Sequence, residues 1–208
     1  MGEMQIRELT LEQMRGLYAR RLTEDFPPDE LKPIALLERA MARNEYVCYG
    51  AEEDGAILAY AFFMVRGRHA LVDYYAVCAG LRDRGIGSRF LQGLIAGPLA
   101  GIDCALLEVE DPDCAAGDGE QMRRRIAFYL KNGLTDTGAR AAVQGVPFRI
   151  LALPVGGACA PEEALRVYAE LYRAILPPEL YGKWVDLRGA AGTTEPYRGR
   201  RGPRKEEE

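Results

Sequence analysis

The chain of 208 residues has the composition of an ordinary globular protein, with 48% hydrophobic and 28% charged residues. A net charge of −4 argues against a protein that binds nucleic acid by bulk electrostatics, because such domains are basic on their contact face. Five cysteines without a C-x-x-C pair, and one histidine, form no zinc pattern, so we expect a reduced cytoplasmic protein without a metal site. No segment is apolar enough for a membrane span or a signal peptide, and we expect no membrane partner.

The first half of the sequence predicts a strand, two helices and three further strands, in that order. Apolar residues recur at helical spacing from about Leu11 and from about Pro33, and runs of β-branched and aromatic residues indicate the strands. The expected strands span 4–9, 46–51, 56–65 and 70–77, and the expected helices start at 11 and span 32–43. The strand over 70–77 is apolar on both faces, so we expect it inside the sheet.

The second half predicts a helix over 85–94, a strand over 104–110, a helix over 120–132, strands over 134–143 and 147–153, and a helix over 161–176. Pro177-Pro178 ends this last helix. From Gly189 onward the chain has no Leu, Ile, Val or Phe and cannot bury enough apolar surface to order itself. We therefore expect one domain over 1–156, a helical extension over 157–188 packed on it, and a disordered tail over 189–208.

A strand end, a glycine-bearing turn and the start of a helix follow one another between Val77 and Leu91. The first N–H groups of a helix have no intrahelical partner and lie at the positive end of its dipole, so this segment is an anion-binding site. The amides are those of Gly85, Ile86, Gly87 and Ser88, with Arg82 and Arg84 as cationic side chains. Two common phosphate motifs fit poorly. A dinucleotide fingerprint needs glycine where Phe90 stands, and a P-loop needs lysine where Ser88 stands.

The remaining pattern, Arg82-x-x-Gly85-x-Gly87 after a strand, resembles the R/Q-x-x-G-x-G/A motif of the GNAT superfamily of N-acetyltransferases, which binds the pyrophosphate of acetyl-CoA. Downstream, 105–110 resembles the next strand of that family, and 126–134 resembles its F-Y-x-x-x-G-F segment. The resemblance implies an α/β (α+β) fold: a single mixed, mostly antiparallel central sheet, splayed at strands 4 and 5 and flanked by helices. Ala79, Asp83 and Leu134 depart from the family pattern, and Asp83 puts a negative charge near the pyrophosphate.

The resemblance also implies the site residues and acetyl-CoA as cosubstrate. The pantetheine arm would lie between the strand ending at Val77 and the strand over 104–110, with backbone N–H groups near Val77 polarising the thioester. The residues implied to bind the cosubstrate are Ala76, Val77, Arg82, Asp83, Arg84, Gly85, Ile86, Gly87 and Ser88. Tyr129 matches the tyrosine beside the sulfur and would be the general acid. Its alternative role is a core aromatic on one helical stripe with Met122 and Ile126.

Glu108 and Glu110 alternate with apolar residues, so both project from one face of a strand, about 7 Å apart. Either could accept the proton of an amine. We prefer Glu108 as the base because it lies deeper in the strand, and the alternative is that both are surface charges. The run Arg123-Arg124-Arg125 either supplements the phosphate-binding cations or is a solvated helix face.

Three functions are compatible with these residues. The first is an N-acetyltransferase acting on a primary amine of a small molecule or peptide, by direct attack in a ternary complex. The second is a non-catalytic GNAT-like module that binds acyl-CoA or an amine, and the third is a nucleotide-binding protein using 85–88. The resemblance implies an acceptor pocket built by about 15–40, the last strands and the C-terminal helix, and we expect a monomer or homodimer.

Overall fold

The computed structural model describes residues 4–28, 30–114 and 117–188, so the predicted tail over 189–208 lies outside the described residues. Within them, eight strands form one sheet in the order β1-β2-β3-β4-β5-β7-β6-β8. β4 and β5 run parallel, and the other neighbouring pairs are antiparallel. The strands are β1 Gln5–Glu8, β2 Tyr46–Glu53, β3 Ala56–Arg66, β4 His69–Val77, β5 Cys104–Glu110, β6 Thr135–Val143, β7 Val146–Ala152 and β8 Val185–Arg188. The predicted mixed, mostly antiparallel sheet is confirmed.

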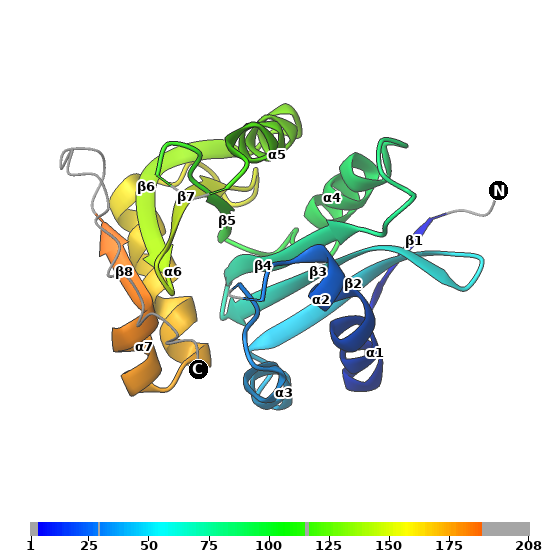
Figure 1. Ribbon diagram of the computed structural model, residues 1–208, viewed down its shortest axis with the longest axis horizontal. Coiled ribbons are helices and arrows are strands. Elements are labelled where there is room, and N and C mark those ends of the chain that lie inside the picture. Colours follow the sequence, from blue (N-terminus) through cyan, green and yellow to red (C-terminus); the bar gives the residue numbers. More distant parts are fainter. Residues whose placement is uncertain (1–3, 29, 115–116, 189–208) are drawn as a thin grey trace, which may run out of the picture.

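Helices cover both faces of this sheet, each face with its own hydrophobic core (Figure 1). One core contains buried residues of α1, α3 and α6, and the other contains those of α4 and α5. The helices are α1 Leu11–Leu17, α2 Thr23–Asp25, α3 Ile34–Ala42, α4 Ile86–Ala96, α5 Gly119–Lys131, α6 Pro161–Ile175 and α7 Pro178–Trp184, with a π-helical turn, η1 Tyr18–Leu22, between α1 and α2. The result is a helix–sheet–helix sandwich.

The sheet splits between β4 and β5, as predicted. These strands pair only from His69 with Cys104 to Val72 with Leu107, and beyond that point they diverge (Figure 1). At the same place the register of β3 against β4 shifts, so that Asp73 is an extra residue in β4. A β-bulge of this kind bends its strand and increases the local twist. The bulge therefore separates β4 from β5 just where their pairing ends.

Two parts of the fold differ from the sequence-based expectation. The helix expected from Leu11 is not one regular α-helix, because the π-helical turn η1 lies between α1 and α2. After α6 the chain forms α7 and then β8, neither of which was predicted. The prolines end α6, but Pro178 also occupies the first turn of α7, where a missing N–H costs nothing. β8 has only four residues and depends on pairing with β6, which no local pattern predicts.

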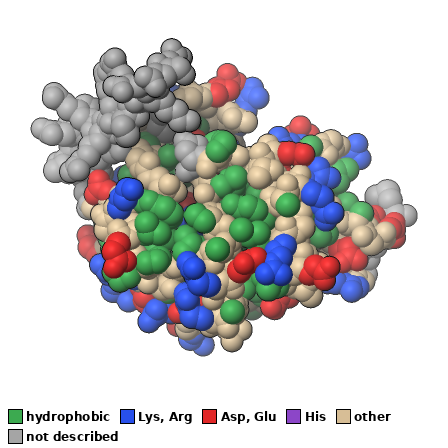
Figure 2. All heavy atoms as spheres, turned by 60° about the horizontal axis from the view of Figure 1, so that its bottom comes forward, with side chains coloured by type: hydrophobic (Ala, Val, Ile, Leu, Met, Phe, Trp, Pro, Cys, Tyr) green, Lys and Arg blue, Asp and Glu red, His purple; other side chains and the backbone are tan. Residues whose placement is uncertain are grey.

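The surface carries charges of both signs. On the face in Figure 2, acidic and basic side chains are interspersed around a group of hydrophobic side chains. Within the described ranges, no helix combines the length and the apolar character needed to cross a bilayer.

Candidate active site

A cavity of about 610 Å³ opens where β4 and β5 diverge. Its lining comes from both faces of the sheet: Tyr129 and the start of α4 belong to the α4–α5 side, and Phe26, Tyr74 and Glu108 to the other side. The gap between the strands thus connects two half-sites through the sheet. Two molecules that enter from opposite faces can meet between β4 and β5.

The start of α4 contributes backbone N–H groups to the cavity wall. Gly85 is the residue preceding the helix, and the first intrahelical bond runs from the Arg89 N–H to the Gly85 carbonyl. The N–H groups of Ile86, Gly87 and Ser88 therefore have no intrahelical acceptor, and all three residues line the cavity. These amides, at the positive end of the helix dipole, suit a bound phosphate.

Close packing fixes this helix start against β4 and α5. A Cβ on Gly87 would lie 3.2 Å from Val77 Cγ2 and 3.3 Å from Phe128 Cζ, so only glycine fits without displacing a neighbour. The Tyr75 hydroxyl donates a 2.5 Å hydrogen bond to the Gly87 carbonyl. Both contacts hold the amide groups at the edge of the cavity.

The structure brings most of the predicted cosubstrate-binding residues together. Those that line the cavity are Ala76, Val77, Arg82, Asp83, Gly85, Ile86, Gly87 and Ser88. Arg84, in contrast, is exposed and does not belong to the lining among the described residues. Of the three consecutive arginines, Arg124 and Arg125 line the cavity and Arg123 does not, because one helix cannot direct three successive side chains to the same side.

Asp83, which departs from the family pattern, has a backbone conformation that favours glycine. Its φ is 62°, in the left-handed region where glycine is favoured and aspartate is tolerated. The side chain is exposed and lies at the cavity wall beside the free amides. Its negative charge opposes a bound phosphate.

We expect Asp83→Asn to tighten the binding of CoA by about 2- to 5-fold, because it removes this charge and asparagine still tolerates a positive φ. Isothermal titration with CoA measures the change. Asp54→Asn is the matched control, since Asp54 is also exposed and has a φ of 51°, in the hairpin turn away from the cavity. Equal CoA affinity of the Asp83 variant and the parent would contradict the expectation.

Tyr129 lies on α5 with its side chain in the cavity wall and in the core at once. It is 5% exposed and makes edge contacts with Tyr75 and Phe128, at centroid distances of 6.1 and 5.2 Å. Burial raises the pKa of Tyr129 to about 12, against a smaller lowering by Arg125. The hydroxyl therefore stays protonated at neutral pH and can donate a proton to a strong base formed beside it. The two roles considered for Tyr129 are compatible.

Glu108 faces the opposite half of the cavity, where α6 covers it. The Tyr172 hydroxyl donates to Glu108 Oε1 at 2.9 Å and to Oε2 at 3.0 Å, and the Tyr168 hydroxyl donates to Oε2. Desolvation raises the pKa of Glu108, Lys32 and the two hydroxyls oppose the rise, and Asp73 adds to it. Glu110, two residues on, forms a 2.6 Å ion pair with Arg125 of α5. The two carboxylates thus have different partners.

A buried ion pair, missed at the sequence level, lies beside Glu108. Lys32 Nζ is 2.6 Å from Asp73 Oδ1, and the two side chains are 4% and 0% exposed. The Tyr46 hydroxyl donates to Asp73 Oδ2, and the Lys32 ammonium lies over the Tyr74 and Tyr172 rings. Burial lowers the pKa of Lys32, but the attraction of Asp73 and Glu108 outweighs it and the pKa is raised. Lys32 remains an ammonium.

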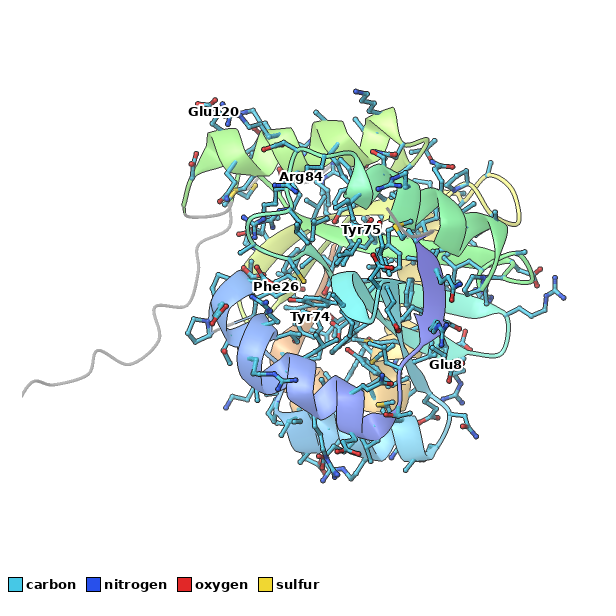
Figure 3. All side chains as sticks on the ribbon, turned by 90° about the vertical axis from the view of Figure 1, so that its right-hand side faces the viewer. Glu8, Phe26, Tyr74, Tyr75, Arg84 and Glu120 are labelled. Atoms are coloured by element: carbon cyan, nitrogen blue, oxygen red, sulfur yellow. The ribbon has the colours of Figure 1, made fainter. Side chains whose placement is uncertain are left out.

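The segment before α3 is held in place by tyrosine hydroxyls. Tyr18 donates to the Lys32 carbonyl at 2.8 Å, the Lys32 N–H donates to the Tyr74 hydroxyl at 2.8 Å, and that hydroxyl donates to the Glu30 carbonyl. Phe26 packs edge-on against Tyr74 at 5.0 Å, and Figure 3 shows the two side by side below Tyr75. Together they form an aromatic wall of the cavity on the α6 side of the sheet.

Arg82 lines the cavity beside the start of α4 and also contacts α2. Its guanidinium is 3.0 Å from Asp25 at the end of α2, and the other carboxylate oxygen of Asp25 accepts the Tyr60 hydroxyl. The predicted phosphate-binding arginine is thus also a contact of the predicted acceptor region.

Comparison with known proteins defines the family. Residues 11–133 match the model of the acetyltransferase (GNAT) family, which is more than half of the chain. The chain belongs to the GNAT acetyltransferase family. It is an acyltransferase of a family that uses acetyl-CoA, and the predicted resemblance is confirmed. No curated protein sequence matches this acetyltransferase at a significant level.

Solved structures of low sequence identity share the fold. A GNAT-family acetyltransferase from Bacteroides thetaiotaomicron aligns with a TM-score of 0.63 at 20% identity, over 81% of this chain and 96% of its own. The ribosomal-protein-S18-alanine N-acetyltransferase of Escherichia coli aligns with a TM-score of 0.54 at 22% identity, over 75% and 96%. A Salmonella typhimurium acetyltransferase solved with its cofactor acetyl-CoA aligns with a TM-score of 0.52 at 18% identity, over 76% and 98%.

Within residues 4–28, 30–114 and 117–188, no group of three or more His, Cys, Asp or Glu side chains is arranged to hold a metal ion.

Proposed function

We propose that this acetyltransferase transfers the acetyl group of acetyl-CoA to a primary amine of a small molecule or peptide, by direct attack in a ternary complex. The observation that carries the proposal is the cavity through the sheet, which places Tyr129 on one side and Glu108 on the other. A donor bound on the α4–α5 side and an acceptor bound on the α6 side would meet at the gap between β4 and β5.

The amides at the start of α4 and the Arg82 guanidinium would hold the pyrophosphate of the donor. The thioester would lie beside the end of β4. There the Cys78 N–H donates to the Leu58 carbonyl of β3. Because successive N–H groups of a strand point to opposite edges, the Val77 N–H points away from β3, toward the side that β5 has left. It is placed to donate to a carbonyl oxygen in the gap.

Glu108 and Tyr129 then perform the two proton transfers. The ammonium form of the substrate first loses one proton to solvent, and Glu108 accepts the second proton, which leaves the nitrogen as the neutral amine forms the new C–N bond. Tyr129, protonated because burial raises its pKa to about 12, donates a proton to the thiolate released when the C–S bond breaks. In each turnover the Glu108 carboxylate gains a proton and the Tyr129 hydroxyl loses one. Both groups exchange protons with solvent before the next turnover.

The charge of the acceptor half supports an amine as substrate. Lys32 compensates Asp73, which leaves the charge of Glu108 for a cationic ligand. Phe26 and Tyr74 offer aromatic faces, which attract an ammonium group. The Escherichia coli enzyme named above acts on an alanine of a ribosomal protein. A peptide with an amino-terminal alanine is thus a reasonable first probe.

Thiol release from acetyl-CoA, measured across a panel of primary amines and an alanine-initiated peptide, tests the reaction. We expect Tyr129→Phe to lower kcat about 10- to 100-fold while leaving the KM of acetyl-CoA within about 3-fold, because the ring packing stays and only the proton donor is lost.

Tyr49→Phe is the matched control, since Tyr49 lies on β2 in edge contact with Phe63 and outside the cavity lining. CoA binding without turnover on any amine would instead favour the non-catalytic module. A larger thermal shift with ATP or NAD than with CoA would favour a nucleotide-binding protein.

A further inference from the structure

Helix α6 lies outside residues 11–133, the part of the chain that matches the family model, yet it reaches the centre of the active site. Tyr168 and Tyr172 stand one turn apart on its buried face, so both hydroxyls point to the same place. That place is the carboxylate of Glu108. The two rings pack at 4.8 Å and are fully buried, so their positions are fixed by the core around them.

We propose that Tyr168 and Tyr172 are positioning residues for acetyl transfer, which hold Glu108 ionised and keep its Oε1 directed at the acceptor amine. This inference rests on the proposed function of Glu108 as the base. It assigns a role in the reaction to the C-terminal helix, which the family-model match does not cover.

The distribution of hydrogen bonds over the carboxylate supports this role. The Tyr172 hydroxyl shares its one proton between Oε1 at 2.9 Å and Oε2 at 3.0 Å, whereas the Tyr168 hydroxyl donates to Oε2 alone. A carboxylate has about four acceptor sites on its two oxygens. Oε1 therefore keeps capacity for a further donor, and Glu108 lines the cavity where an amine would arrive.

The balance of charges around Glu108 shows why the hydroxyls are needed. The titratable groups that face it are Lys32 from the segment before α3, Asp73 and Tyr74 from β4, and Tyr168 and Tyr172 from α6. Desolvation and Asp73 raise the pKa of Glu108, while Lys32 and both hydroxyls lower it. Burial raises the pKa values of the two tyrosines well above the ordinary value, so they stay protonated donors. Without them, Lys32 alone would oppose protonation of the base.

The direction of the effect follows from the charge of each form. A tyrosine hydroxyl stabilises the carboxylate of Glu108 and not its protonated form, so its removal raises the pKa of Glu108. Protonated Glu108 cannot accept a proton from the amine. As the pH falls, the variant therefore loses activity at a higher pH than the parent does. Tyr→Phe keeps the ring and its packing, and thus removes the hydroxyl alone.

Carbon-13 NMR of the CoA-bound protein, labelled at the δ-carboxyl of glutamate, measures this pKa directly and needs no acceptor. The resonance that disappears in Glu108→Gln is assigned to Glu108. We expect the midpoint of its titration to rise by about one pH unit in Tyr172→Phe, and further in the double Tyr168→Phe/Tyr172→Phe variant. Tyr181→Phe, on α7 under Arg173, is the control and should leave the midpoint unchanged.

Kinetics with the alanine-initiated peptide provide the second measurement. We expect the acid limb of kcat/KM to move to higher pH by the same amount as the NMR midpoint. A second peptide, whose amine has a different pKa, shows how much of the acid limb is caused by ionisation of the substrate. In the double variant, kcat at pH 6.5 should fall at least about tenfold, and the loss should shrink as the pH rises.

The outcomes separate this inference from the proposed function. If Glu108→Gln abolishes turnover but the tyrosine variants leave the titration midpoint and the acid limb in place, the positioning role is wrong and the base assignment stands. If the tyrosine variants lose kcat equally at every pH, the hydroxyls act structurally and the inference is also wrong. If Glu108→Gln retains parental turnover, Glu108 is not the base and both assignments fail.

Discussion

Replacing Glu108 by glutamine is expected to lower kcat by about 10²- to 10³-fold, with the affinity for acetyl-CoA unchanged. Glutamine has the shape of glutamate and can still accept a tyrosine hydroxyl, but it cannot take a proton from the amine. The donor would bind on the other side of the sheet, so its contacts are untouched. Steady-state thiol release at saturating acetyl-CoA, with CoA titration in parallel, measures both effects.

Glu110→Gln is the matched control for this experiment. Glu110 lies on the same strand and in the same cavity wall, but its carboxylate is engaged by Arg125 at 2.6 Å. We expect this variant to keep kcat within about 5-fold of the parent. The reverse pattern, with turnover lost in Glu110→Gln and retained in Glu108→Gln, would move the base to Glu110, the alternative that the sequence left open.

Lys32→Met is expected to lower the free energy of unfolding by about 3–5 kcal/mol, because it leaves the Asp73 carboxylate buried without its cation. Breaking a buried pair costs more than the pair contributes, since the remaining charge is desolvated. Tyr46 still donates to Asp73 but cannot neutralise it. Chemical denaturation at pH 7, followed by circular dichroism, measures the loss.

Two further variants test the cause of this loss. Lys32→Met/Asp73→Asn removes both charges, and we expect it to be more stable than Lys32→Met alone. Arg15→Met breaks the ion pair between the exposed Arg15 and Glu38, and we expect it to keep the stability of the parent because solvent screens such pairs. A double variant as unstable as the single one would show that lost packing of the lysine chain, and not the unpaired charge, causes the loss.

The local patterns predicted well those parts of the fold whose signals are contained in short segments. The strand Cys104–Glu110 has the predicted bounds and α6 begins at the predicted Pro161, because apolar periodicity and a proline in the first turn act within a few residues. η1, α7 and β8 were missed. Their stability comes from neighbours far along the chain, such as β6 for β8, and short elements carry little periodicity of their own.

The site shows the same division. The Arg82–Ser88 segment could be read from the sequence because a strand end, a glycine turn and a helix start are adjacent in the chain. The Lys32–Asp73 pair could not, since 41 positions separate the partners and the bulge at Asp73 breaks the alternation that tells which face a residue occupies. Tyr168 and Tyr172 lie in the segment predicted as a helix over 161–176, and their spacing of four residues indicates only a shared helix face. Their hydroxyls reach the carboxylate of Glu108 only because α6 packs over it.

By itself, the sequence determined the order of most strands and helices and the GNAT resemblance, because helix-start amides and hydrophobic periodicity are local properties. The tertiary structure decided which residues meet. It put Arg84 outside the cavity wall, paired Glu110 with Arg125, and gave Glu108 two tyrosine donors from a helix about 60 residues away. Protonation and charge depend on burial and on partners within a few ångströms, and only the folded chain brings those partners together.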